Sequence, residues 1–170
     1  MEKQIILLNG PSSAGKSTLS RTLRSVIKDK TNKSFEVVSI DDFMKLVLNT
    51  NEKIYEDDVF EISGLMCNKV LESLETNDGV IVDHVITSER IFNEFNNMLN
   101  NYDIFSVHVD CPLETLLKRE RERGNRCEGT AESSYIYLYP KTGYNLTVDS
   151  DKMTSEECAL EILKKIDKAV

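Results

Sequence analysis

The sequence contains no long apolar run, and this absence limits where the protein can work. Its longest uninterrupted apolar stretches are four or five residues, far short of the roughly 20 residues that a membrane-spanning helix needs. Residues 1–4, followed by a short apolar run, also lack the hydrophobic region of a secretory signal peptide. We therefore expect no membrane partner and a cytoplasmic location.

Residues that ligate transition metals or form disulfides are also scarce. The only histidines are His84 and His108. The four cysteines are scattered, with no C-x-x-C pair: Cys67, Cys111, Cys127 and Cys158. This pattern is typical of free thiols in a reducing compartment and argues against a disulfide framework or a zinc site.

An excess of basic charge is missing as well. The net charge of −8 argues against nucleic acid as a partner, because phosphate backbones require basic surfaces. The charge is uneven, since residues 1–34 carry seven Lys or Arg against two Asp or Glu, whereas residues 35–103 carry four against fifteen. Residues 118–126 carry five basic residues and two acidic ones. Positive charge is therefore concentrated in two segments of an acidic chain.

One of these basic segments contains a phosphate-binding motif. Residues 10–17, GPSSAGKS, match G-x-x-x-x-G-K-[ST] in full. The aliphatic run of residues 5–8 predicts a buried strand before the motif, and Leu19, Leu23 and Ile27 predict a helix after it. The expected nucleotide contacts are Gly10, Pro11, Ser12, Ser13, Ala14, Gly15, Lys16, Ser17 and Thr18.

The motif predicts binding of ATP with Mg²⁺. Gly10 and Gly15 let the backbone approach an anion closely, because neither has a Cβ. The loop amides and the start of the helix attract phosphate. Lys16 supplies charge for the β- and γ-phosphates, and the Ser17 hydroxyl is a Mg²⁺ ligand. The alternative is a glycine-containing turn with a chance lysine.

The order of predicted elements indicates an α/β fold. Strands are expected at residues 5–8, 34–40, 80–83, 102–110 and 144–149, and helices at 17–27, 43–48, 63–75, 88–99, 113–123 and 154–169. Residues 49–62 look irregular and acidic, and residues 128–139 are ambiguous. This alternation predicts one domain, residues 1–170, in which helices cover both faces of a five-stranded parallel sheet.

Acidic residues follow two of these strands, at the edge where ligands bind. Asp41 is the expected general base that accepts the proton of an acceptor hydroxyl, and Asp42 is the less favoured choice. The alternative is that one of them caps the following helix. Asp83 is the expected Mg²⁺ ligand, unless it makes only a structural hydrogen bond to the phosphate loop. A lone histidine such as His84 is more often structural.

The second basic segment predicts an arginine-bearing lid over about residues 113–139. Arg119 and Arg123 share one helix face, and Arg126 lies beyond Gly124, where the chain can bend. Guanidinium groups above a triphosphate would stabilise charge in the transition state. The alternative is a solvated helix with Arg–Glu pairs.

The sequence resembles the chloramphenicol phosphotransferase-like family of P-loop kinases over nearly its whole length. The resemblance rests on residues 6–17, on Ile40-Asp41 and Val82-Asp83, on residues 119–126, on Tyr144 and on residues 148–150. It implies a P-loop three-layer sandwich with strand order 2-3-1-4-5 and ATP-dependent phosphorylation of a hydroxyl on a small molecule.

The resemblance also implies roles for particular residues. The catalytic base falls on Asp41, the lid arginines on Arg119, Arg123 and Arg126, and the adenine is expected near Asp149 and Ser150. This chain has Tyr139 and Asn145 where antibiotic-modifying members would place His and Asp.

Other functions stay open at this point. One is a zeta-toxin-like, nucleotide or cofactor kinase, and another is a P-loop switch that binds nucleotide without transferring phosphate. An acidic cluster, Glu56, Asp57, Asp58 and Glu61, favours a neutral or cationic acceptor, unless it is only a solvated loop. Kinases of this size commonly pair, so a homodimer is also an open expectation.

Overall fold

Five parallel strands form one sheet in the order β2-β3-β1-β4-β5 in the computed structural model, which describes residues 2–47, 54–124 and 127–169. This is the predicted α/β fold with the predicted strand order. The strands are β1 (Gln4–Asn9), β2 (Phe35–Ser39), β3 (Gly79–His84), β4 (Asp103–Asp110) and β5 (Leu146–Asp149). The helices are α1 (Lys16–Thr31), α2 (Ile40–Val47), α3 (Glu56–Thr76), α4 (Glu89–Met98), α5 (Leu113–Arg123), α6 (Thr130–Tyr137) and α7 (Ser155–Ala169).

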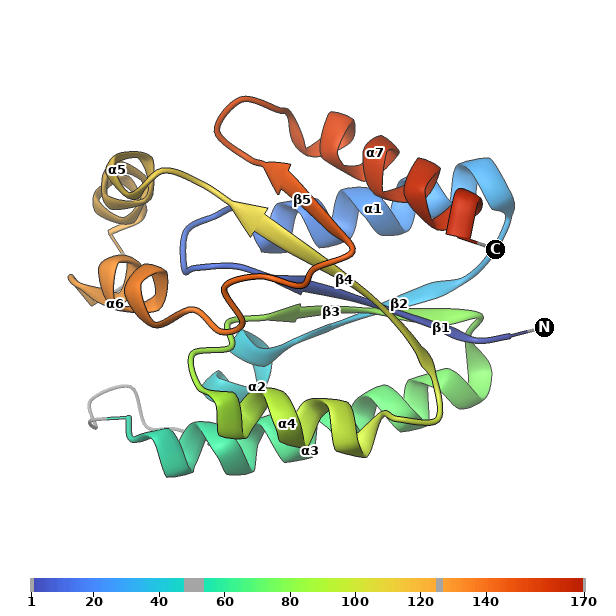
Figure 1. Cartoon of the computed structure of the whole chain (residues 1–170), viewed down its shortest axis with the longest axis horizontal. Helices are drawn as coiled ribbons and strands as arrows, with labels where there is room; N and C mark the ends of the chain where they lie inside the picture. The colour runs from blue at the N-terminus through green and yellow to red at the C-terminus, as the bar shows by residue number, and fades with distance from the viewer. Residues whose placement is uncertain (1, 48–53, 125–126, 170) are drawn as a thin grey trace.

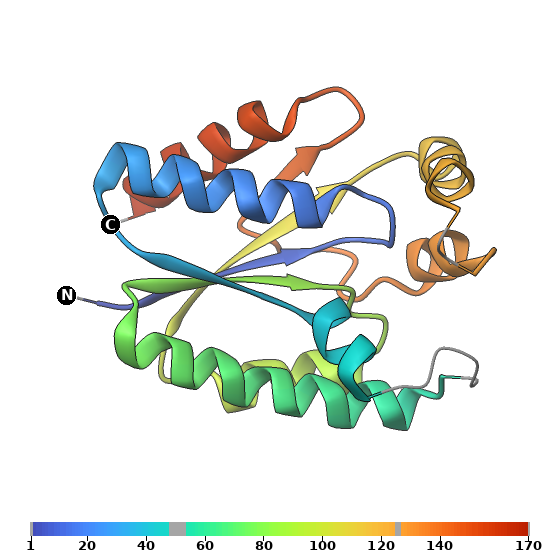
Figure 2. The same cartoon turned by 180° about the vertical axis from the view of Figure 1, so that it is seen from behind.

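The sheet separates two hydrophobic cores because side chains alternate along each strand. In β1, Ile6 and Leu8 point into the core beneath α1 and α7, whereas Ile5 and Leu7 point into the core that α3 and α4 close. Figures 1 and 2 show these two helix pairs on opposite faces of the sheet. A central strand buried on both faces explains the continuous aliphatic run in the sequence.

The register places the carboxyl ends of the strands side by side. Asp83 of β3 lies opposite Leu8 of β1 on one side and Ser39 of β2 on the other. The phosphate loop follows β1 at this edge, and Figure 1 shows α5 and α6 beyond the same edge. The fold therefore gathers the predicted loop, the acidic strand ends and the basic segment at one end of the sheet.

Several predicted boundaries are wrong, mainly because helices begin or end in polar sequence. The short helix expected from Phe43 begins at Ile40. The first helix continues past Ile27 to Thr31 and ends where Asn32 adopts a left-handed conformation. The helix expected from Ser63 begins at Glu56 instead, so residues 56–62 are helical and not irregular. Three acids in its first turn suit the positive end of the helix dipole, and the Asp58 carboxylate accepts a hydrogen bond from Tyr55 N at 3.0 Å.

Two helices in the second half of the chain complete the fold. Thr154 and Glu157 form a reciprocal capping box before α7, with the Glu157 carboxylate 2.9 Å from Thr154 N and the Thr154 hydroxyl 3.1 Å from Glu157 N. The segment left ambiguous contains α6. In the described part of the chain, no helix is both long and apolar enough to cross a bilayer.

His84 ties the end of β3 to α3. Its ring is fully buried, and Nε2 lies 3.0 Å from the Ser63 hydroxyl on α3. Nδ1 accepts a hydrogen bond from Val85 N at 2.9 Å, so the neutral ring carries its proton on Nε2 and donates it to Ser63. Burial, with a smaller contribution from Lys16, lowers the pKa of His84 to about 3, although Asp41 opposes the shift.

This pKa predicts a loss of stability in acid. In the unfolded chain His84 has an ordinary pKa near 6.5, so below that pH the unfolded state binds a proton that the folded state rejects. The free energy of unfolding should fall as the pH drops from about 6.5 towards 3. Urea denaturation at several pH values should show a shallower fall for His84→Gln than for the wild type, and parallel curves would contradict the prediction.

Candidate active site

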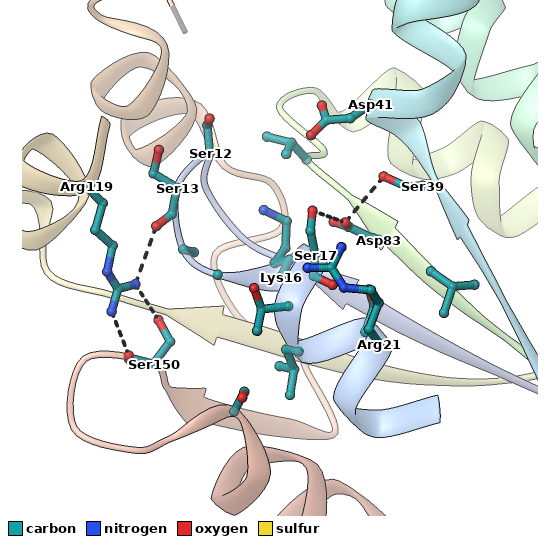
Figure 3. Close-up of a pocket in the computed structure, with 18 of the residues that line it drawn as sticks. Ser12, Ser13, Lys16, Ser17, Arg21, Ser39, Asp41, Asp83, Arg119 and Ser150 are labelled. Carbon is teal, nitrogen blue, oxygen red and sulfur yellow. Dashed lines mark hydrogen bonds between the residues drawn. The ribbon is translucent and has the colours of Figure 1, made fainter. Parts of the chain in front are cut away.

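A cleft of about 960 Å³ opens at the carboxyl ends of the strands. It is lined by the phosphate loop, the start of α1, the ends of β2 and β3, the first turn of α2 and part of α5. Figure 3 shows Asp41 and Asp83 on one side of Lys16, and Arg119 with Ser150 on the other. The cleft therefore has two sides, which differ in their chemistry.

The phosphate loop has the backbone geometry of an anion-binding nest. Ser13 and Gly15 both adopt left-handed conformations, with φ of 71° and 87°. Ala14 N donates to Pro11 O at 3.2 Å, which closes the turn, and Leu19 N donates the first bond of α1 to Gly15 O at 3.0 Å. Amides before Leu19 belong to a first helical turn, which offers them no intrahelical acceptor. Such amides are suited to bind phosphate oxygens.

Neighbouring elements hold the loop from outside. A Cβ at Gly10 would lie 2.5 Å from Val109 O on β4, so only glycine lets the loop leave β1 this close to the next strand. Ser12 N donates to the Ser134 hydroxyl of α6 at 2.9 Å. Ser134 was not predicted, and its spacing in the sequence gives no signal of this contact.

The polar groups of the loop fit a polyanionic ligand. The buried Lys16 ammonium donates to Pro11 O at 2.8 Å. The hydroxyls of Ser12 and Ser13 are buried and have no hydrogen-bond partner among the described residues. Buried hydroxyls are normally satisfied, and phosphate oxygens in the nest would satisfy these.

The two predicted Mg²⁺ ligands lie together. The Ser17 hydroxyl donates to Asp83 Oδ2 at 3.0 Å, and the Ser39 hydroxyl lies 3.3 Å from the same oxygen. A hydroxyl and a carboxylate next to bound phosphates are the hard oxygen donors that Mg²⁺ prefers. The pair fits a magnesium ion held between the protein and a triphosphate. Ser39 was not predicted, although its place at the end of a strand was a signal.

Asp41 and Asp42 lie in the first turn of α2 and both line the cleft. The structure places both inside the helix, whereas a cap would precede it. Asp41 is partly buried and Asp42 is exposed. The charges of both Lys16 and Asp41 act on the pKa of the buried His84, so both lie within electrostatic reach of this ring.

Arg119 connects α5 to the phosphate loop and to the loop after β5. Its Nη2 donates to Ser150 O at 2.9 Å, and its Nη1 lies 3.4 Å from Ser13 O. A Cβ on Gly15 would lie 3.9 Å from the same Nη1. The guanidinium thus lies where the phosphate loop meets the segment expected to contact adenine.

Only some of the remaining predicted site residues lie at the cleft. Arg123 is exposed and lines the cleft, whereas Arg126 lies outside the described residues. Ser150 lines the cleft, but Asp149 does not. The Asp149 carboxylate accepts hydrogen bonds from Asp151 N and Lys152 N at 2.9 and 3.1 Å, so it shapes the loop and does not face the nucleotide site.

The position of the acidic cluster removes the reason for expecting a neutral or cationic acceptor. Glu56, Asp57, Asp58 and Glu61 belong to α3, and none of them lines the cleft. The Asp57 carboxylate instead pairs with Arg90 at 2.5 Å. This acidic cluster therefore gives no reason to favour a neutral or cationic acceptor. Basic residues that do line the cleft were missed: Arg21, Arg24 and Lys45.

Several solved structures share the fold of this protein. The structure resembles the APS kinase CysC of Mycobacterium tuberculosis solved with AMPPNP and APS (TM-score 0.76, 17% identity, 98% of each chain covered). It also resembles the shikimate kinase of Acinetobacter baumannii solved with shikimate (TM-score 0.69, 18% identity, 99% of this chain and 95% of that one). A gluconokinase of Sinorhizobium meliloti is a third (TM-score 0.72, 12% identity, 98% and 93%). No curated protein matches the sequence.

The fold and the phosphate loop together define a P-loop kinase of small molecules. A family model described as "chloramphenicol phosphotransferase-like protein" matches residues 3–167. The chain belongs to the chloramphenicol phosphotransferase-like family, as its sequence motifs predicted.

Replacing Arg119 should weaken nucleotide binding. Arg119→Ala removes the hydrogen bonds to Ser150 O and Ser13 O and should raise the Kd for Mg-AMPPNP about tenfold, the effect of losing roughly one charge-assisted hydrogen bond. Isothermal titration calorimetry would measure this change. Arg121→Ala removes the same charge from an exposed position of the same helix outside the cleft, and an equal loss in both variants would contradict the prediction.

Replacing Asp83 should change the response to magnesium. Asp83→Asn keeps the shape of the side chain but removes the charge that Mg²⁺ requires. The Mg²⁺ concentration for half-maximal ATP binding should rise by at least about tenfold. Ser39→Ala, which removes a hydrogen bond to Asp83 and leaves both proposed ligands in place, serves as the comparison. An unchanged magnesium dependence in Asp83→Asn would refute the assignment.

Proposed function

We propose that this protein transfers the γ-phosphate of ATP to a hydroxyl group of a small molecule. The observation that carries the proposal is the placement of Asp41 on the cleft wall across Lys16 from Arg119 and Ser150. An acceptor hydroxyl would approach from the side opposite the loop that contains Ser150, and this carboxylate lies on that side. A protein that only binds nucleotide has no use for such a base.

The residues of the cleft supply the needs of phosphoryl transfer, which are positioning and charge stabilisation. The nest and Lys16 hold the β- and γ-phosphates. The acceptor oxygen forms a bond to the γ-phosphorus while the bond from that phosphorus to the β–γ bridging oxygen breaks, leaving ADP. Asp41 accepts the proton of the acceptor hydroxyl.

Ser17 and Asp83 would hold Mg²⁺, which when bound neutralises charge on the phosphates. Arg119 orients the nucleotide between the phosphate loop and Ser150. Arg123 and Arg126 complete the positive charge from the segment after Arg119. In this proposal α5 and α6, within residues 113–139, form the lid of one kinase domain spanning residues 1–170.

The proposal also covers the setting of the reaction. Cys67, Cys111 and Cys158 are buried free thiols, and Cys127 is an exposed one. Burial raises the pKa of the Cys67 thiol to about 12, with Glu94 adding to the shift, so this thiol is unreactive at neutral pH. Four free thiols and a need for ATP suit the cytoplasm. Pairing of two copies remains part of the proposal.

The role of Asp41 predicts a separation of binding from turnover. Asp41→Asn should keep the Kd for Mg-AMPPNP and lower kcat by about 10²- to 10⁴-fold, the range for loss of a general base. Asp42→Asn, one residue along the same helical turn, should change kcat far less. If Asp41→Asn turned over at the wild-type rate, Asp41 would not be the base.

The acceptor can be sought directly by mass spectrometry. The protein is incubated with MgATP and chloramphenicol, and separately with a pool of aminoglycosides, nucleosides and small polyols. A product heavier by one phosphoryl group identifies the acceptor, and the Asp41→Asn variant should not form it. ATP hydrolysis at a rate that no compound alters would instead support a nucleotide switch.

A further inference from the structure

One face of α1 carries a basic stripe that the transfer reaction described above does not use. Arg21 and Arg24 follow Ser17 at spacings of four and seven residues, so the three side chains project from one side of the helix. All three line the cleft. With a rise of 1.5 Å per residue, Arg21 and Arg24 lie roughly 6 and 10 Å along the helix axis from Ser17.

The stripe faces the acceptor side of the cleft. β2 is an edge strand of the sheet, and its Val37 and Ser39 line the cleft together with the two arginines. Figure 3 shows Arg21 on the same side as Ser39, Asp41 and Asp83, away from Arg119 and Ser150. Lys45 of α2 lines this part of the cleft as well. The loop after β5, which contains Ser150, thus lies on the other side of the cleft.

These three cations, like Arg123, lack the contacts that hold Lys16 and Arg119 in the cleft. The charged group of Lys16 donates to Pro11 O, and that of Arg119 donates to Ser13 O and Ser150 O. By contrast, Arg21, Arg24 and Lys45 form no ion pair with another residue in the described ranges. Two of the acids on this side already have other roles, since Asp83 bonds to Ser17 and Ser39 and Asp41 is the proposed base. The third, Asp42, is exposed and forms no ion pair with these cations in the described ranges.

Three cations without internal partners beside an acceptor site favour a ligand that brings negative charge. Arginine binds phosphate and carboxylate groups through paired N–H donors. A neutral acceptor would leave this charge with no function in binding.

We propose that the natural acceptor carries an anionic group, a phosphate or a carboxylate, which Arg21 and Arg24 bind with help from Lys45. This inference rests on the proposed function and narrows its substrate class. The acceptor is then a molecule that carries both a hydroxyl and the anionic group. Chloramphenicol, which has no anionic group, does not fit this description.

The first test measures binding and needs no knowledge of the acceptor. The protein is saturated with Mg-AMPPNP, so that the phosphate loop is filled, and is titrated with sodium sulfate at constant ionic strength while its Tm is followed. The wild type should gain stability with sulfate. Arg21→Gln/Arg24→Gln should need about tenfold more sulfate for the same gain, the loss expected when charge-assisted hydrogen bonds are removed.

A matched variant controls for the loss of charge. Lys28→Gln/Lys30→Gln removes two positive charges from exposed positions of the same helix outside the cleft, and it should respond to sulfate like the wild type. Equal responses in the two double variants would overturn the proposal, as would a wild type that gains nothing from sulfate. Failure of Mg-AMPPNP itself to bind would instead refute the proposed kinase function.

The second test compares acceptors in matched pairs, each a hydroxylated compound with and without a phosphate or carboxylate, such as adenosine monophosphate beside adenosine. ADP release should be at least about tenfold faster with the charged member of the productive pair. For that compound Arg21→Gln/Arg24→Gln should raise KM about tenfold and leave the KM for ATP unchanged. Preference for the neutral member would overturn the proposal.

Discussion

The site depends on a backbone conformation that the phosphate loop would not keep by itself. Ser13 holds a left-handed φ of 71°, which costs a residue with a side chain of order 1–3 kcal/mol. The surrounding elements offset this cost through hydrogen bonds from Ser12 N to Ser134 and from Arg119 to Ser13 O. The loop is thus held in this shape by the protein itself, and its amides are positioned to meet phosphate.

The parallel sheet turns this local shape into a site with two distinct sides. Because Asp83 lies in register with Leu8 and Ser39, the carboxylate meets the start of α1 at the Ser17 hydroxyl. The crossover to β4 and β5 carries Arg119 and Ser150 to the other side. Groups suited to metal and acceptor are therefore separated from groups suited to the nucleotide by the order of the strands alone.

The sequence predicted the fold well, because it depends on local patterns. The strand, the glycine-rich motif and the helix after it are contiguous, and aliphatic runs mark the buried strands. The prediction erred where polar residues do structural work. The acids from Glu56 onward start α3, but in a sequence such acids look like a solvated loop.

Other features could not be predicted because they join residues far apart in the chain. Ser134 reaches Ser12 and Arg119 reaches Ser150 only once the sheet is assembled. The spacing of Arg21 and Arg24 after Ser17 can be read from the sequence. The element that faces these arginines cannot, because it depends on the position of β2 at the edge of the sheet. Contacts of this kind can be predicted only when the topology of the fold is known.

Two adjacent residues of α5 link this helix to the phosphate loop and to α6, so that α5 and α6 would move together. Arg119 bonds to the phosphate loop, whereas the buried Glu120 carboxylate accepts a hydrogen bond from Ala131 N at 2.9 Å, at the start of α6. Any movement that takes α5 away from the loop must take α6 and its Ser134 with it. Both supports of the loop would then be lost together, so departure of the nucleotide and relaxation of its binding loop would be a single event.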